Sequence, residues 1–228
     1  MDNFVDLYCE RTAAGFWNEP VNALTNLAFI IAALIAWPAA WRRPERSAIE
    51  LTVIALVAAI GVGSFLFHTL ATPLSGAADV IPIWLFFFAY ILLIFIRITG
   101  GKTFDIIGYM VATLFGFVAV VYLVGLTSRD GAPLNGSLQY APALIAMALA
   151  SAIAAFRGHP VWRYFAGATA IFIMSLTFRS LDQASCVMTG GLGTHFLWHI
   201  LNATVLGILL LGTVRAMPPT LQIHPQKK

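Results

Sequence analysis

Two short stretches, far apart in the chain, carry the residue types that can do chemistry. The first, GSFLFHTL, places Ser64 four residues before His68, and Asp79 follows eleven residues later. The second, GTHFLWHI, holds His195 and His199 at the same four-residue spacing. Residues four apart share one face of a helix, so each pair can present both side chains to one neighbour. Three imidazoles with one open position form the ligand set of a catalytic zinc, and a carboxylate beside them could move a proton.

The segments around these residues are apolar enough to cross a membrane. The chain of 228 residues is 60% hydrophobic and 10% charged, with a mean hydropathy of +0.85, whereas a soluble domain carries about 25% charged residues. A spanning helix takes about 20 mostly apolar residues. Such runs cover residues 22–41, 48–71, 78–98, 105–126, 138–156, 161–178 and 193–214. We therefore expect an all-α, seven-transmembrane helix bundle, with residues 1–228 forming a single membrane domain.

Lysine and arginine residues predict the orientation of this bundle. With the N-terminus outside, the inner loops and tail hold Arg42, Arg43, Arg46, Arg97, Lys102, Arg157, Arg163, Arg215, Lys227 and Lys228. The outer segments hold only Arg11, Arg129 and Arg179. This bias follows the positive-inside rule. We expect the polar segment 1–21 outside, and the tail 216–228 in the cytoplasm.

The predicted orientation brings the five polar residues to one depth. The second run ends outside just after His68, the third begins outside with Asp79 in or just before its first turn, and the last run begins outside with His195 and His199. Ser64 lies one turn below His68. Three helices therefore contribute polar groups to the same outer third of the membrane, which favours a metal site.

Each residue also has a simpler interpretation. A lone histidine in a transmembrane helix is most often a hydrogen-bonded packing residue, and the HxxxH spacing without the glutamate of HExxH is weakly specific. Asp79 alone could be a helix N-cap, and Ser64 could bond a carbonyl one turn back. Arg179 and Asp182, which precede the last run, are expected to form a surface pair or a cap.

The combination of motifs resembles the alkaline ceramidases. These belong to a wider superfamily of seven-helix membrane hydrolases that also includes the adiponectin-type receptors. The family pattern is Ser-x3-His, an Asp a short way on, and a late His-x3-His; here "GSFLFH", Asp79 and "HFLWH" match it. The opening "YCE" and "EPVNALTNLAFI" are also similar to the start of that family. The resemblance covers the chain from about residue 8 to residue 210.

The resemblance implies a zinc-dependent hydrolase that cleaves a ceramide-like lipid into a fatty acid and a sphingoid base. His68, His195 and His199 would hold the zinc, which polarises a carbonyl and acidifies a water. Asp79 would be the general base on that water and then the proton donor to the leaving amine. Ser64 would help to stabilise the oxyanion. Trp198, inside the second motif, is a candidate for lining the substrate pocket.

The resemblance also implies features of the N-terminal segment. Glu10 and Glu19 match two carboxylates of the family's calcium site, and oxygen ligands suit calcium; the alternative is that both are ordinary charges of the outer side. Cys9 and Cys186 both fall outside in the predicted topology, where disulfides persist, and the resemblance supports this pair. The alternative is that both are free, buried thiols.

Other functions remain open at this point. A non-enzymatic seven-helix receptor or sensor could keep the metal as a structural element, but a structural zinc normally has four protein ligands, so Asp79 would have to be the fourth. Haem ligation needs paired histidines on facing helices, which fits poorly. A retinal pump needs a buried lysine, and no lysine lies within the expected spans. Short loops favour a bacterial inner membrane, with a lipid substrate at the periplasmic side, no nucleic acid and no obligate protein partner.

Overall fold

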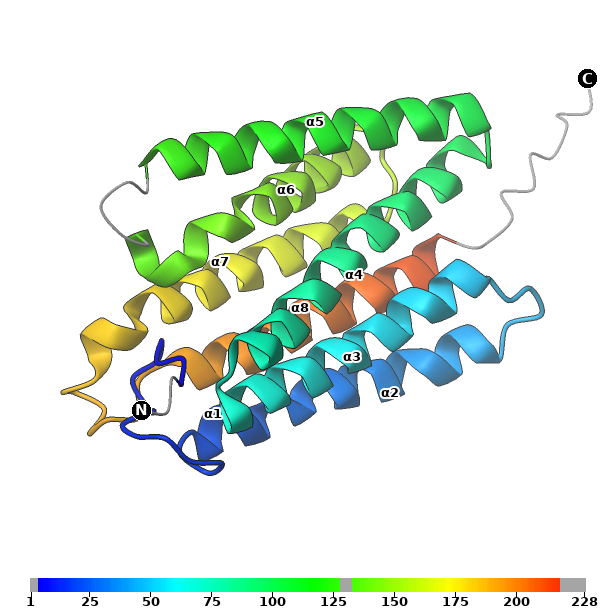
Figure 1. Ribbon diagram of the computed structural model, residues 1–228. Helices are drawn as coiled ribbons and strands as arrows, with labels where there is room; N and C mark the ends of the chain where they lie inside the picture. Colours follow the sequence, from blue (N-terminus) through cyan, green and yellow to red (C-terminus); the bar gives the residue numbers. More distant parts are fainter. Residues whose placement is uncertain (1–3, 128–132, 218–228) are drawn as a thin grey trace, which may run out of the picture.

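The computed structural model describes residues 4–127 and 133–217, and all regular structure in these ranges is helical (Figure 1). The elements are α1 (Pro20–Thr25), α2 (Leu27–Trp41), α3 (Ala48–Leu70), α4 (Pro73–Thr99), α5 (Thr103–Thr127), the 3-10 segment η1 (Pro133–Tyr140), α6 (Ala141–Phe156), α7 (Trp162–Ser185) and α8 (His195–Ala216). With α1 and α2 counted as one span, the described residues hold 7 helices long and apolar enough to cross a membrane. Most of the expected tail, residues 218–228, lies outside the described ranges.

The third span begins five residues earlier than the sequence predicted. Thr72 is the N-cap of α4 and exchanges hydrogen bonds with Ser75 in a capping box, while Pro73 occupies the first position of the helix. Proline and a hydroxyl cap are favoured there, so the polar stretch that we interpreted as a loop is a helix start. Asp79 therefore lies in the second turn of α4. Its placement in or before the first turn, and its interpretation as an N-cap, are wrong.

The sixth span continues seven residues beyond its predicted end. Residues 179–185 lie between the sixth and seventh predicted runs, but they complete α7. Arg179 and Asp182 are both buried inside the bundle. The interpretation of the two as a surface pair is wrong, because their polarity reflects contacts with other segments of the chain and not exposure to water.

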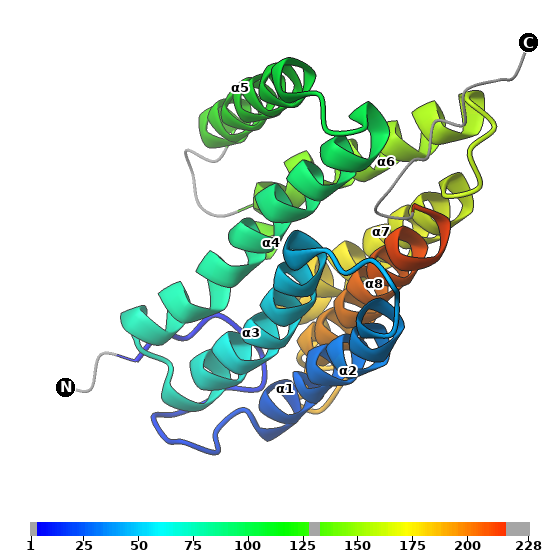
Figure 2. The same ribbon diagram turned by 90° about the vertical axis from the view of Figure 1, so that its right-hand side faces the viewer.

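The helices alternate in direction and form two ends with different roles (Figure 1). One end, which we call the site end, gathers the N-terminal segment 4–19, the α3–α4 connection and the α7–α8 connection. The opposite end, the far end, gathers the α2–α3, α4–α5 and α6–α7 connections. Helix α8 packs on α2 and α7 and is the most buried span. Helix α5 lies at the edge of the bundle beside α4 and α6, as Figure 2 shows, and exposes its apolar side chains.

A buried ionic network closes the far end. The carboxylate of Glu50 on α3 accepts hydrogen bonds from Arg97 on α4 and from Arg43 at 3.0 and 3.2 Å. Arg97 also donates to the backbone carbonyl of Met217 after α8. Charges inside a membrane protein are paired in this way because isolated charges are costly there. These contacts hold three spans together, well away from the histidines of the site end.

Candidate functional site

Three histidines from two helices converge at the site end. His68 lies in the last turn of α3, and His195 and His199 lie in the first two turns of α8. All three are almost fully buried, and one nitrogen of each lies within 4.8 Å of the others. Within the described residues, this is the group of histidine, cysteine and acidic side chains that could hold a metal. The Nε2 atoms of His68 and His199 are 3.1 Å apart.

The neighbours of two imidazoles fix where their protons lie. Burial raises the pKa of the Glu19 carboxyl, but the hydrogen bonds and charges of His68 and Arg11 outweigh burial and bring the pKa below its usual value. Glu19 is therefore a carboxylate that only accepts, and Nδ1 of His68 donates to it at 2.5 Å. The Thr25 hydroxyl gives its single proton to a backbone carbonyl of α1. It must therefore accept from Nδ1 of His199, 3.0 Å away.

This arrangement fits a bound cation. With both Nδ1 atoms donating, the two Nε2 atoms face each other across 3.1 Å, so either a proton or a metal cation must lie between them. Two nitrogens about 2.0–2.1 Å from one tetrahedral zinc are about 3.3 Å apart, close to the observed separation. His195 adds a buried Nδ1 that has no hydrogen-bond partner among the described residues, a costly arrangement for a ring that only packs. Donors of this type suit zinc.

Ser64 and Asp79 meet because α3 and α4 approach unusually closely. Gly63 lies against the backbone of α4, and a Cβ at this position would overlap the Ala78 carbonyl. This contact brings the residue after Gly63 beside the residue after Ala78. The Ser64 hydroxyl interacts with the carboxyl group of Asp79. Asp79 is not among the group that could hold the metal.

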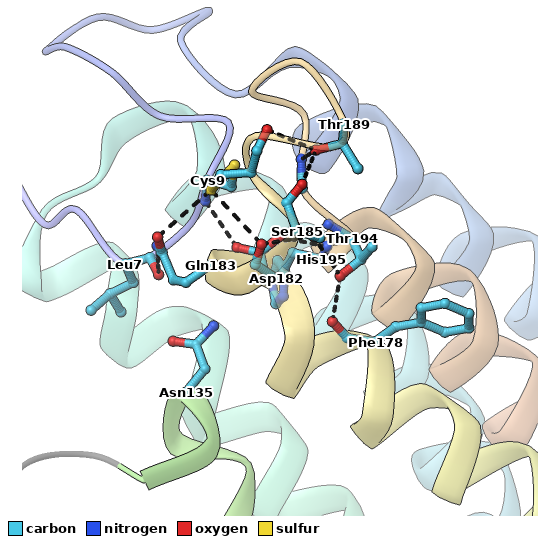
Figure 3. Close-up of a disulfide and its surroundings, with 12 residues drawn as sticks. Leu7, Cys9, Asn135, Phe178, Asp182, Gln183, Ser185, Thr189, Thr194 and His195 are labelled. Atoms are coloured by element: carbon cyan, nitrogen blue, oxygen red, sulfur yellow. Dashed lines mark hydrogen bonds between the residues drawn. A yellow bond between two sulfur atoms is a disulfide. The ribbon is translucent and has the colours of Figure 1, made fainter.

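The N-terminal segment folds over the histidines. The ring of Tyr8 stacks on that of His195, with centroids 3.5 Å apart and planes 13° apart. Burial raises the pKa of the Tyr8 hydroxyl, which accepts a hydrogen bond from Nη1 of Arg179 at 2.8 Å. The next residue, Cys9, is joined by a disulfide to Cys186 after α7, across 177 residues of sequence (Figure 3). The segment is therefore tied to the α7–α8 connection above the site.

Asp182 links this segment to the start of α8. Its carboxylate accepts from the backbone amides of Cys9, Thr194 and His195 at 2.8 to 2.9 Å, as can be followed in Figure 3. Asp182, which lies on α7, therefore caps the N-terminus of α8. The expectation that Asp182 serves as a cap is confirmed. Gly193 has a φ of +71° and lies against Asp182, leaving no room for a side chain. Asp182 thereby fixes the first turn of α8, where His195 begins.

Aromatic rings surround the buried guanidinium of Arg179. The guanidinium of Arg179 lies 5.3 to 5.5 Å from the ring centroids of Tyr8, Tyr140 and Trp198. Such contacts stabilise a desolvated cation. Trp198 is 4% exposed and packs against Tyr140 and Phe172. Its expected role in lining the substrate pocket stays a prediction, because these are contacts with other residues of the same chain.

The two carboxylates expected to bind calcium have other partners. The oxygens of Glu10 accept from the backbone amides of Val21 and Asn22 at the start of α1, at 2.8 Å each. Burial raises the pKa of the Glu10 carboxyl, although these amides lower it. Glu19 accepts from Arg11, His68 and the side chain of Asn22. All four oxygens thus face N–H donors, and a guanidinium lies beside Glu19, so the residues present do not fit a calcium site.

Sequence reasoning missed several residues that surround the histidines. They are Tyr8, Arg11 and Thr25; Arg179 was expected at the surface, and Glu19 acts here through His68. Each acts across the fold, with sequence separations of 49 for Glu19–His68 and 174 for Thr25–His199. The one sequence feature that could have indicated such residues is the pair Arg179 and Asp182, which directly follows a predicted spanning run. Such residues are rarely buried in a membrane protein without a function.

Comparison with known proteins agrees with this geometry. No curated protein sequence matches the chain. A family model described as Ceramidase matches residues 7–226, nearly the whole length, and so includes most of the N-terminal segment, all seven spans and both histidine motifs. The chain therefore belongs to the Ceramidase family.

Proposed function

We propose that the protein is a zinc-dependent lipid amide hydrolase that works within the membrane and cleaves an N-acyl sphingolipid of the ceramide type. The products would be a fatty acid and a sphingoid base. Membership of the Ceramidase family supports hydrolysis of an amide bond. The observation that carries the proposal is the pair of facing Nε2 atoms of His68 and His199, with the third imidazole beside them. Such a group with three protein ligands is typical of a catalytic zinc and not of a closed structural one.

The roles of the residues follow from their contacts. His68, His195 and His199 would hold the zinc, which when bound would polarise the substrate carbonyl and acidify a water. Asp79 would take the proton of the attacking water and later give it to the leaving nitrogen, a task worth about 10²- to 10⁴-fold in rate. The Ser64 hydroxyl, which interacts with Asp79, would donate to the oxyanion that develops on the amide oxygen.

The depth of the site suits a lipid substrate. The histidines lie within the first two turns of α8 and the last turn of α3, close to one end of the spans. A ceramide amide lies near the level of the headgroups while its two tails stay in the hydrocarbon region. We propose that Trp198, between the two histidines of α8, borders the bound lipid. A polar nucleic acid or an obligate protein partner has no place in this scheme.

The charges and the disulfide support an orientation for the bundle. At the far end lie Arg42, Arg43, Arg46, Arg97, Lys102, Arg157, Arg163 and Arg215, near the ends of their helices. Basic residues concentrate on the cytoplasmic side. The Cys9–Cys186 disulfide lies at the site end, and disulfides persist in oxidising compartments. We propose that the site end faces away from the cytoplasm, which in a bacterial inner membrane is the periplasmic side.

The test is metal content by mass spectrometry, beside ceramide hydrolysis, on protein purified in detergent without chelators. His68→Ala and His199→Ala should lose both zinc and hydrolysis. His159→Ala is the matched control, because this histidine lies in the α6–α7 connection at the far end and should leave both unchanged. A wild-type protein without stoichiometric metal would refute the hydrolase. Zinc without hydrolysis of any lipid amide would favour a receptor with a structural metal.

A further inference from the structure

The side chain of Arg11 is a buried cation in a shell of oxygens. Arg11 is 3% exposed, and its guanidinium makes four hydrogen bonds. Nε donates to Oε1 of Glu19 at 2.5 Å, Nη2 donates to the backbone carbonyl of His68 at 2.8 Å, and Nη1 donates to the carbonyls of Ala13 and Gly15 at 3.4 Å. A charge is buried this completely only when it is paired and hydrogen-bonded.

These acceptors are of the kind that calcium uses. Calcium takes six to eight oxygens from carboxylates, backbone carbonyls and water. Here one carboxylate and three carbonyls converge on the guanidinium. Arg11 supplies positive charge at the place where the sequence resemblance led us to expect calcium. A dication beside it would be repelled at short range in a medium of low dielectric constant.

The Arg11 guanidinium is connected to the three histidines through the carboxylate of Glu19. Glu19 bonds Arg11 through Oε1 and Nδ1 of His68 through Oε2. A carboxylate on the second nitrogen of a ligating histidine fixes the tautomer and the direction of the ring. Arg11 also holds the His68 carbonyl, one of the last carbonyls of α3, which have no partner within the helix. The guanidinium therefore fixes His68 from its side chain and from its backbone.

We propose that Arg11 takes the place of a calcium ion in this protein, as a positioning residue that orients His68 through Glu19 and makes the zinc site independent of calcium. This rests on the proposed zinc hydrolase. It adds that the cation beside the site is part of the polypeptide, so the ionic link between the N-terminal segment and α3 forms whenever the chain folds. Changes in calcium concentration should then leave zinc binding and hydrolysis unchanged.

The first test uses the wild-type protein in detergent, passed over a chelating resin and then supplied with zinc. Calcium content, thermal unfolding and ceramide hydrolysis are measured with and without added millimolar calcium. We expect no stoichiometric calcium and no change of unfolding temperature or rate on adding it. Bound calcium, or a wild-type protein that calcium stabilises or activates, would overturn the proposal. Absence of zinc or of hydrolysis under all conditions would instead refute the hydrolase, so the two failures are distinguishable.

The second test removes the cation. Arg11→Ala should lower zinc affinity by about 10- to 100-fold, the usual effect of losing an outer-shell partner, and millimolar methylguanidinium or calcium should restore part of it. Arg46→Ala is the matched control, because the Arg46 side chain is exposed at the far end. Arg11→Lys keeps the charge and should retain more zinc than Arg11→Ala. Wild-type zinc affinity in Arg11→Ala, or a folded variant that neither cation rescues, would contradict the assignment.

Discussion

The close contact between α3 and α4 allows a test of how the Asp79 carboxyl group and the Ser64 hydroxyl are positioned. Gly63 lies against the Ala78 carbonyl, and the next residue along each helix belongs to the proposed chemistry. We expect Gly63→Ala to push the two helices apart at the level of Ser64 and Asp79. The three histidines, which lie on α3 and α8, should keep their mutual arrangement and their zinc.

The size of the effect can be worked out from the contact. A Cβ on Gly63 would overlap the Ala78 carbonyl oxygen, and relief of that overlap takes a shift of roughly 1.5 Å, since unstrained contacts between nonbonded atoms lie near 3.5 Å. Overpacking of this kind costs about 1–3 kcal/mol of stability. A misplacement of about 1 Å at a reacting group can cost about 10²-fold in rate, which corresponds to about 2.7 kcal/mol of barrier. We therefore expect turnover to fall by about 10²-fold, beside a loss of about 1–3 kcal/mol of folding stability.

The assay compares ceramide turnover, zinc content and thermal unfolding in the same preparations. Gly108→Ala on α5 is the matched control, because a Cβ there meets no atom within 4 Å. Alanine is the better helix former by about 0.5–1 kcal/mol, so this control should keep full turnover and unfold no earlier than wild type. If Gly63→Ala turns over ceramide at the wild-type rate, then the closeness of α3 and α4 does not position Asp79.

Further predictions concern the remaining parts of the site. Asp79→Asn should keep zinc, measured by mass spectrometry, while ceramide hydrolysis falls by about 10²- to 10⁴-fold; full turnover would remove the general-base role. Asp182→Ala should lower both the unfolding temperature and zinc affinity, because hydrogen bonds to a buried charge are worth about 1.5–3 kcal/mol each. The exposed Asp105→Ala on α5 should do neither. A reporter enzyme that is active only in the periplasm should stay inactive when fused after residue 228, and activity there would reverse the proposed orientation.

The spans were predictable because a membrane restricts the chain so strongly. With no water to satisfy backbone groups, a crossing outside a closed barrel is a helix of apolar residues, and hydropathy finds such helices directly. The predicted ends failed at α4 and α7 for a common reason. Pro73 and its cap begin α4, and Arg179 and Asp182 continue α7, but polar or helix-breaking residues at these places have the composition of a loop. Composition cannot distinguish a residue that faces water from one that faces a buried partner.

The histidines were predictable for a different reason. Their spacing on helices, combined with alternating helix direction, is enough to bring His68, His195 and His199 to one level without any tertiary detail, and the structure brings them together. The residues that orient them leave no such pattern. Thr25 contacts His199 through the packing of α1 on α8, and Glu19 contacts His68 only because the N-terminal segment folds back over α3. Neither contact has a periodicity that a sequence window could detect.

The polar segment before the first span is therefore part of the proposed metal centre. Tyr8 stacks on His195, and Glu19 with Arg11 holds His68, so residues outside the membrane-spanning helices orient two of the three imidazoles. The disulfide at Cys9 ties this segment to the connection that precedes α8. Helices alone can bring three histidines close together, but ring direction and proton position depend on hydrogen bonds to the other nitrogen. In this chain, the membrane-spanning helices determine the distances between the three histidines. The N-terminal segment determines the ring directions of His68 and His195 and the proton position on Nδ1 of His68.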